Sequence, residues 1–260
     1  MSKQKPVVIA CAMEEEAQPF LKALTAEAKQ TTNSAEDAQT PTVRTPVMPE
    51  GFRGPTTFAA GTLCGHPTIV VTTGIGMTNA AMAATATLMQ VEPRAYILAG
   101  TTGGLGREVN VGHGIIADST LYHDADASAF GYRRGQIPQM PALYGADPEL
   151  LDLLERTSGD VGAPLHVGQV SASNSFVTAP QVPHVREAFP EVVAVDMETA
   201  AAAQVCFTFS VPWVSLRAVS DMCDPDAATA FDEGAPEAAQ VSFNMVEALL
   251  NALHDNQESE

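Results

Sequence analysis

The stretch VDMETAAAAQVCFTFSVPWVSLRAVSD, residues 195–221, organises the rest of this chain. Residues 197–210 contain no proline or glycine and are rich in alanine, which predicts a buried helix. Residues 211–219 are rich in β-branched and aromatic types, which predicts a core strand. A helix followed by a buried strand is typical of an α/β fold.

Charged residues stand at the two ends of this stretch. Glu198 stands in the first turn of the predicted helix, and Arg217 and Asp221 close the strand. Burying such charges costs several kcal/mol unless they are paired or used. In open α/β sheets, ligands bind at the carboxyl ends of the strands, so these residues form the first candidate site.

Composition restricts the class of protein. The chain has 260 residues and a formal net charge of -18, with only 13 lysines and arginines, which argues against a nucleic-acid partner. Four cysteines lie far apart without a CxxC pair, so we expect reduced, mostly buried thiols and a cytoplasmic protein. Residues 7–13 are apolar but too few for a signal or membrane segment, and no longer apolar run occurs.

Helices and strands are expected to alternate along the rest of the chain. We expect a single domain over residues 1–260. Residues 25–55 are rich in Thr, Ser, Gln, Glu and Pro, which predicts a mobile surface insertion. Residues 222–234 are expected to be an acidic loop, and residues 255–260 a polar tail. Strands are expected at residues 6–12, 58–63, 67–73, 95–99, 114–119, 166–172 and 192–195, and helices at residues 14–24, 77–90, 147–157, 183–189 and 236–254.

Several loops between these elements are candidates for ligand contact. Glycines in GIG (residues 74–76) and GTTGG (residues 100–104) allow the backbone to approach a ligand, although neither loop completes a dinucleotide or P-loop motif. One of the three glutamates at residues 14–16 should point back over the first strand, because successive helix positions turn by about 100°. Phe176 is equally compatible with the core and with stacking on a base.

The apolar loop at residues 122–141 has aromatic side chains that a surface loop cannot bury by itself. It therefore predicts packing on a partner chain or over a ligand. Its His123, Asp124 and Asp126 lack a second cluster of metal ligands, so a hydrogen-bonded structural role is expected for them.

Four pieces in fixed order resemble the 5'-methylthioadenosine/S-adenosylhomocysteine nucleosidases of the nucleoside phosphorylase superfamily. They are AMEEE, GIG with NAA, YHDADASAFGY with GQ and a proline, and VDMETAA with RAVSD. The resemblance covers the chain except residues 25–55. It implies a three-layer α/β/α sandwich with a mixed central sheet. It also implies hydrolysis of the bond between ribose C1′ and adenine N9, without a metal or cofactor.

The resemblance assigns the acid and the base that such a reaction requires. Asp221 would protonate adenine N7, with Ser220 orienting it, and Glu16 would deprotonate a water held by Arg217 and Thr101. A leaving-group acid must keep its proton near neutral pH, so burial or the bound purine should raise the pKa of Asp221.

Other residues would bind the substrate by the same resemblance. Glu198 would accept hydrogen bonds from the ribose hydroxyls and so stay ionised. Met197 would pack on the sugar, Phe176 would stack on adenine, the backbone of Val177 would read the base edge, and Ile75 would line the pocket.

The family is homodimeric, and a neighbouring subunit completes its pocket for the 5′-substituent. By position, Ala127, Phe130, Tyr132 and Pro138 resemble that apolar pocket, together with Met13. A thioalkyl group has no charge to pair, so burial is what holds it.

Three positions depart from the family pattern: Met77 where Lys or Pro is frequent, Thr101 where Ser is usual, and Asp196 where Glu is common. The alternatives are a futalosine or aminodeoxyfutalosine hydrolase, a phosphate-dependent phosphorylase and a non-catalytic nucleoside-binding protein. 5′-Deoxyadenosine is a further possible substrate, because one methylene changes preference by only about 1 to 3 kcal/mol.

Overall fold

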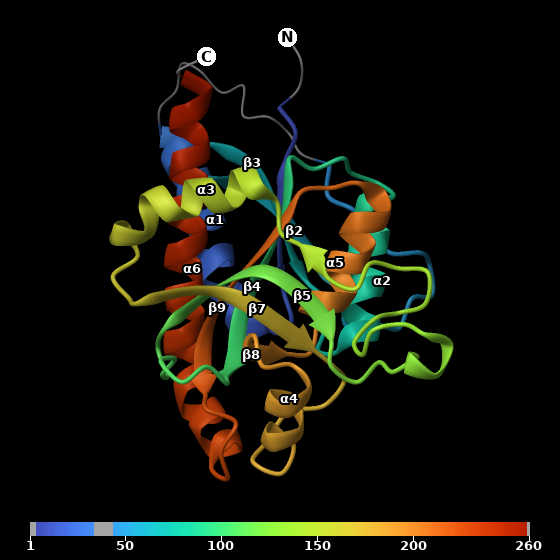
Figure 1. The fold of residues 1–260 in the computed structure, drawn as a ribbon. Helices are drawn as coiled ribbons and strands as arrows, with labels where there is room; N and C mark the ends of the chain where they lie inside the picture. The colour runs from blue at the N-terminus through green and yellow to red at the C-terminus, as the bar shows by residue number, and fades with distance from the viewer. Residues whose placement is uncertain (1–3, 34–43, 259–260) are drawn as a thin grey trace.

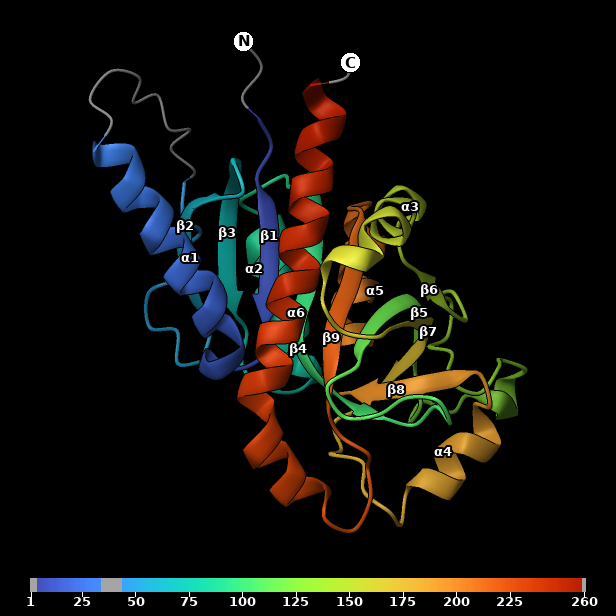
Figure 2. The same ribbon diagram turned by 90° about the vertical axis from the view of Figure 1, so that its left-hand side faces the viewer.

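The computed structural model describes residues 4–33 and 44–258. A mixed β-sheet lies between two layers of helices (Figures 1 and 2). This arrangement confirms the expected three-layer α/β/α sandwich.

The sheet runs in the order β2-β3-β1-β4-β8-β7-β5-β6, and β9 pairs with β4 and β5. Its strands are β1 (Val7–Cys11), β2 (Thr57–Leu63), β3 (His66–Thr72), β4 (Ala95–Gly104), β5 (Gly114–Tyr122), β6 (Tyr144–Gly145), β7 (Leu165–Ala172), β8 (Val192–Asp196) and β9 (Trp213–Asp221). The pairing is parallel between β3 and β1, between β1 and β4, and between β4 and β9. Strand β2 forms the expected antiparallel hairpin with β3. Every residue of β1 and β9 is buried, as expected for parallel strands covered on both faces.

One part of the sheet closes on itself. β4 pairs with β8, β8 with β7, β7 with β5, β5 with β9, and β9 with β4. Five strands therefore form a ring, while β1, β2 and β3 extend it as an open sheet. The sequence expectation of a sandwich did not include this closure, because strand order depends on long-range pairing.

The two helical layers lie on opposite faces of the open part. Helices α2 and α5 pack together on one side, and α1 and α6 cover the other (Figure 2). The helices are α1 (Glu14–Asn33), α2 (Met77–Leu88), α3 (Pro148–Thr157), α4 (Val182–Ala188), α5 (Thr199–Phe209) and α6 (Ala227–Glu258), with short 3-10 turns η1 (Ser128–Phe130) and η2 (Ser158–Asp160).

The structure corrects three predicted boundaries. Helix α1 continues to Asn33, so residues 25–33 are helical rather than part of a mobile insertion; residues 34–43 of that insertion lie outside the described residues. Helix α6 begins at Ala227 and holds Pro236 within it, so most of the expected acidic loop is helical, and the helix continues to Glu258 through most of the expected tail. Strand β4 runs through Gly104, so the GTTGG segment is strand rather than loop.

Part of the remaining insertion is anchored. The side chain of Gln90 accepts a hydrogen bond from the backbone N–H of Val47 and donates one to its carbonyl, at 3.1 and 3.0 Å. Within the described ranges, no helix is both long and apolar enough to span a bilayer.

Candidate active site

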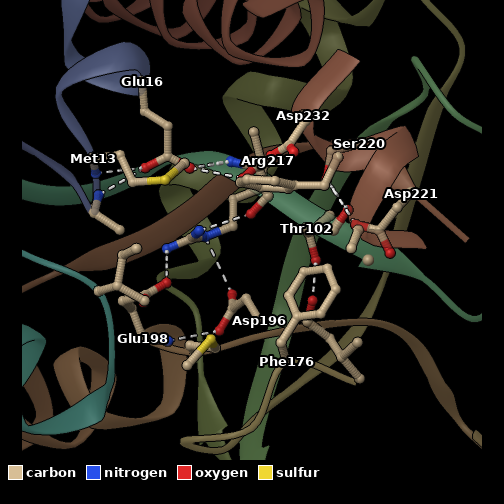
Figure 3. A pocket seen from close by; sticks show the side chains of 18 residues that line it. Met13, Glu16, Thr102, Phe176, Asp196, Glu198, Arg217, Ser220, Asp221 and Asp232 are labelled. Atoms are coloured by element: carbon tan, nitrogen blue, oxygen red, sulfur yellow. Dashed lines mark hydrogen bonds and ion pairs between the residues drawn. The ribbon is translucent and has the colours of Figure 1, made fainter. Parts of the chain in front are cut away.

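A cavity of about 360 Å³ lies where β1, β4, β8 and β9 end (Figure 3). Strands β1, β4 and β9 are parallel, so their carboxyl ends meet at one edge of the sheet. β8 is antiparallel to β4 but pairs only with Gly103 and Gly104, so its own carboxyl end reaches the same place. The predicted residues that line the cavity are Met13, Glu16, Ile75, Thr101, Phe176, Met197, Glu198, Arg217, Ser220 and Asp221.

Glu16 is buried at 1% exposure, whereas its two neighbours in the triple-glutamate run are exposed. One carboxylate oxygen accepts hydrogen bonds from the backbone N–H groups of Ala12 and Met13, at 2.8 and 3.1 Å. The other accepts from the N–H and the hydroxyl of Thr101, at 2.7 and 2.8 Å. The expectation that one glutamate points back over the strand is therefore confirmed, and Thr101 keeps the hydroxyl contact that a serine would make.

Arg217 is held from three directions inside the cavity wall. Its guanidinium donates to the carbonyl of Thr101 at 2.8 Å and to Oε2 of Glu198 at 3.2 Å. Its Nε also lies 3.2 Å from Oδ2 of Asp196, an ion pair without the alignment of a hydrogen bond. Since every side chain involved is nearly fully buried, this group of charges is locked in one arrangement.

Asp196 is a site residue that the sequence argument did not interpret. Its carboxylate accepts from the backbone N–H groups of Glu198 and Thr199, at 3.0 and 2.9 Å, and from the Thr199 hydroxyl. It thus satisfies the open N–H groups at the start of α5 while facing Arg217. Its recognisable signal was an acid directly before residue 197, where the predicted helix starts, which is the usual capping position.

Asp196→Asn should lower the free energy of unfolding by about 2 kcal/mol, because Arg217 would lose one of two buried counter-charges. Urea denaturation would measure the change. Asp160→Asn, which changes an exposed acid in the same way, should shift stability by less than about 0.5 kcal/mol. An Asp196→Asn protein as stable as the unmodified chain would contradict the proposed role of this pair.

Glu198 joins the strand ends to the GIG loop. Its Oε1 accepts a hydrogen bond from the N–H of Gly76 at 2.7 Å, so the polar site expected at the start of α2 is filled by this carboxylate. Burial raises the pKa of Glu198, and the charge of Arg217 opposes that rise. Burial therefore works partly against the ionised state that the resemblance implies.

Asp221 has different surroundings. It is 1% exposed and accepts hydrogen bonds from the Ser220 hydroxyl and the Cys223 N–H, both at 3.0 Å. Burial raises the pKa of Asp221, and these two hydrogen bonds, together with one from the Cys223 thiol, oppose the rise only in part. This direction agrees with the shift predicted for a group that must hold a proton.

Aromatic side chains close the end of the cavity near Asp221. Phe176 meets Phe231 edge to face, with ring centroids 5.9 Å apart. Val177 does not line the main cavity but a recess of about 30 Å³ beside it, which Phe176 and Asp221 also line. Phe231 belongs to the first turns of α6, together with Ala228 and Asp232 of the lining, and all three were missed because this segment was predicted as a loop.

The loop residues expected at the 5′ end lie away from this cavity. Ala127, Phe130, Tyr132 and Pro138 are absent from its lining, and Phe130 is 83% exposed. Met77 also points elsewhere, into a groove along α2.

The polar residues of the same loop make local hydrogen bonds. His123 contacts the Ser171 hydroxyl at 3.0 Å, and Asp126 accepts from the Ser128 N–H at 2.9 Å. No group of three metal-ligating side chains occurs among the described residues.

Comparison with known proteins identifies the family. Residues 6–251 match the Phosphorylase superfamily. A 5'-methylthioadenosine/S-adenosylhomocysteine nucleosidase of Staphylococcus haemolyticus is 38% identical over 197 residues, which are 75% of this chain and 86% of that protein. A crystal structure of the nucleosidase of that name from Neisseria meningitidis, in complex with methylthio-immucillin-A, has a TM-score of 0.83 and 32% identity, covering 95% of this chain and 99% of the other.

A futalosine hydrolase from Helicobacter pylori has a TM-score of 0.80 over 95% of this chain and 97% of its own, but is only 23% identical, a likeness that extends to the fold alone. The nucleosidase matches have a higher sequence identity, 38% and 32%, so they show the family and not the fold alone. This chain belongs to the phosphorylase superfamily and, within it, to the 5'-methylthioadenosine/S-adenosylhomocysteine nucleosidases.

Proposed function

We propose that this protein hydrolyses the N-glycosidic bond of 5′-methylthioadenosine and S-adenosylhomocysteine, and of 5′-deoxyadenosine, releasing adenine and a 5-substituted ribose. One observation carries the proposal. Two buried carboxylic acids line one cavity in different surroundings: Glu16 accepts four hydrogen bonds from N–H and hydroxyl groups, whereas Asp221 accepts two such bonds and a weaker one from the Cys223 thiol. Hydrolysis with an acid for the leaving group and a base for water requires such a difference.

On the leaving-group side, Asp221 protonates N7 of adenine as the bond to C1′ breaks. Burial favours its protonated form, and Ser220 orients the carboxyl group. Phe176 stacks on the purine, with Phe231 beside it, and the backbone of Val177 reads the base edge. Neutral adenine is a far better leaving group than its anion, so this proton transfer lowers the barrier.

On the opposite side, Glu16 takes a proton from the attacking water. Its four hydrogen bonds hold the carboxylate in one position. Thr101 and Arg217 complete the water site, and Glu198 accepts hydrogen bonds from the ribose hydroxyls while Met197 packs on the sugar. Met13 contacts the thioalkyl group, and Ile75 lines the pocket. Because the water and the purine then lie on opposite faces of the ribose, the product has inverted configuration at C1′.

Phosphorolysis is disfavoured by the charges of the cavity. Among the described residues that line it, Arg217 is the only basic one, and its guanidinium already faces Asp196 and Glu198. A phosphate dianion requires cationic or multiple N–H donors that are free to bind it. Water is therefore the better supported nucleophile.

The test is adenine release from 5′-methylthioadenosine by the purified protein, with and without phosphate. We expect the same rate in both cases and free 5-methylthioribose as the second product. A phosphate requirement would move the protein to the phosphorylases. Absence of adenine, with release from aminodeoxyfutalosine or with binding alone, would instead support one of the other two alternatives.

Gly100→Ala should reduce turnover about 10²-fold, because an added Cβ would lie 2.3 Å from Oε1 of Glu16 and displace the base. Gly112→Ala is the matched control, since Gly112 also has a positive φ, +83° against +136°, but nothing within 4 Å of its Cβ position. Steady-state kinetics of both variants would separate displacement of Glu16 from backbone strain. Equal losses in the two variants would contradict the proposed position of the base.

We further propose a homodimer in which Ala127, Phe130, Tyr132 and Pro138 of one subunit complete the 5′ end of the other subunit's cavity. Two surfaces support this proposal. Phe130 projects into solvent at 83% exposure. In addition, a groove of about 1110 Å³ runs along α2 and is lined mainly by apolar side chains, among them Val47, Met48, Phe52, Met77, Met82 and Met89. Exposed apolar surface of this extent is typical of an interface.

Subunit complementation tests the dimer. Glu16→Gln removes the base of a subunit's own site, whereas Phe130→Asp damages the site of its partner. If the subunits exchange in solution, mixing the two weakly active variants forms heterodimers. Each heterodimer should contain one complete site, so activity should be restored. Co-expression with two affinity tags covers the case of slow exchange. A mixture no more active than the sum of its parts, or a monomer by light scattering, would contradict the proposal.

We also propose that the protein is cytoplasmic. Cys11, Cys206 and Cys223 are buried free thiols, and Cys64 is half-buried and not in a disulfide. Free cysteines without disulfides are typical of a reducing compartment.

A further inference from the structure

Ser242 lies on α6, is fully buried and is absent from the cavity lining. Its hydroxyl donates to the carbonyl of Leu216 at 2.6 Å and accepts from the N–H of Gly100 at 2.9 Å. It therefore bridges β4 and β9 at the level where Gly100 pairs with Arg217 in the strand register. Both bonded groups belong to the main chain, one on each strand.

The Gly100 side of this bridge leads to the base. Gly100 has φ +136° and no side chain, which lets the carboxylate of Glu16 rest where a Cβ would be. The next residue, Thr101, donates two hydrogen bonds to that carboxylate, at 2.7 and 2.8 Å. The position of the Gly100 peptide therefore sets the position of Glu16.

The Leu216 side leads to the arginine. Leu216 directly precedes Arg217 on β9, and Arg217 donates to the carbonyl of Thr101 at 2.8 Å. Ser242 thus contacts the residue before Thr101 and the residue before Arg217. One hydroxyl therefore bonds to the main chain of both strands that carry the water side of the cavity.

We infer that Ser242 is a positioning residue for the reaction, acting on Glu16 and Arg217 through the backbone of β4 and β9. The inference rests on the proposed hydrolase function. Without the hydroxyl, the buried N–H of Gly100 loses its partner, and the strand must move to find another acceptor. A shift of the base by a fraction of an ångström is enough to slow attack by water, because reactivity depends steeply on geometry.

The first experiment measures steady-state kinetics of Ser242→Ala with 5′-methylthioadenosine. We expect kcat to fall roughly 10-fold with KM changed less than about 2-fold, because the groups proposed to bind adenine and the ribose are not bonded to Ser242. Ser242→Thr retains the hydroxyl and should recover most of the loss. Thr87→Val is the control, since it removes an equally buried hydroxyl that bonds within α2 to the carbonyl of Ala83, and it should leave kcat unchanged.

A double-mutant cycle separates positioning from general destabilisation. In a Glu16→Gln background, Ser242→Ala should cause little further loss, because the base it positions is already absent. In an Asp221→Asn background, the 10-fold loss should persist, since that acid lies on the other side of the substrate. Equal losses in both backgrounds, or a Ser242→Ala protein with normal kcat, would overturn the inference.

A second variant and a parallel assay of the unmodified protein distinguish failure of folding and of the proposed function from failure of the positioning role. If Ser242→Ala does not fold, Ser242→Cys has nearly the same shape and a much weaker hydrogen-bonding group, so the same loss in kcat is expected from it. Adenine release by the unmodified protein is measured in parallel. No adenine from that protein would defeat the proposed function, whereas normal release by all Ser242 variants would defeat only the positioning role.

Discussion

Asp221→Asn will lower kcat for adenine release by roughly two to four orders of magnitude while leaving substrate binding largely intact, because asparagine cannot donate the proton that the purine requires. The replacement has nearly the same shape: its Oδ1 can still accept from the Cys223 N–H, and the Ser220 hydroxyl can turn to accept from its NH₂. Single-turnover rates with 5′-methylthioadenosine, together with adenine affinity by calorimetry, would measure both parts.

The pH dependence gives a second readout of the same acid. Burial raises the pKa of Asp221, so the protonated, active form persists above the usual range of an aspartic acid and is lost as pH rises through that value. We expect a falling limb on the alkaline side of the kcat profile that disappears in Asp221→Asn. Asp226→Asn, at an exposed acid on the same segment, should keep the limb and the rate. An Asp221→Asn protein with near-normal turnover would remove the acid assignment.

Glu16→Gln is expected to reduce kcat by about 10² to 10⁴-fold, because it removes the group that activates water. The amide also has fewer acceptor positions than the carboxylate, and its NH₂ would face two of the four N–H and O–H donors that now point at Glu16. Presteady-state measurement of the chemical step would show the loss directly.

Glu15→Gln is the matched control for this prediction. Glu15 precedes Glu16 in the same helical turn but is exposed, so its replacement should leave kcat within about 2-fold. If both variants lost activity equally, a general effect on the start of α1 would explain the result better than loss of a base. The proposed division between Glu16 and Asp221 would then not hold.

The positions of most elements could be predicted because their causes are local. The alternation of apolar runs with glycine and proline predicts β1, the β2–β3 hairpin, α2 and α3, whose Asp147 caps the helix by accepting from two backbone N–H groups. That the three glutamates do not share one face follows from helical geometry, and the resemblance selects Glu16 as the one that is buried.

The errors arose where tertiary contacts override local signals. Pro236 and the acidic residues before it predict a loop, yet α6 begins at Ala227 and packs along β4 and β9. The glycines at residues 103–104 predict a turn, yet they are the last residues of a buried strand whose neighbours leave no room for a side chain; a Cβ on Gly103 would lie 2.6 Å from the sulfur of Cys223. Packing stabilises both segments in conformations that their own residues do not favour.

The sequence by itself indicated four of the six charged residues that line the site among the described residues, because Glu16, Glu198, Arg217 and Asp221 each stand at the end of a predictable strand or the start of a helix. Only the tertiary structure decided which of them are paired. Asp196 and Arg217 are 3.2 Å apart although 21 residues separate them in sequence, and Ser242 reaches Gly100 across 142. Charge pairing and hydrogen bonding depend on distances of a few ångströms in space, which local periodicity does not encode.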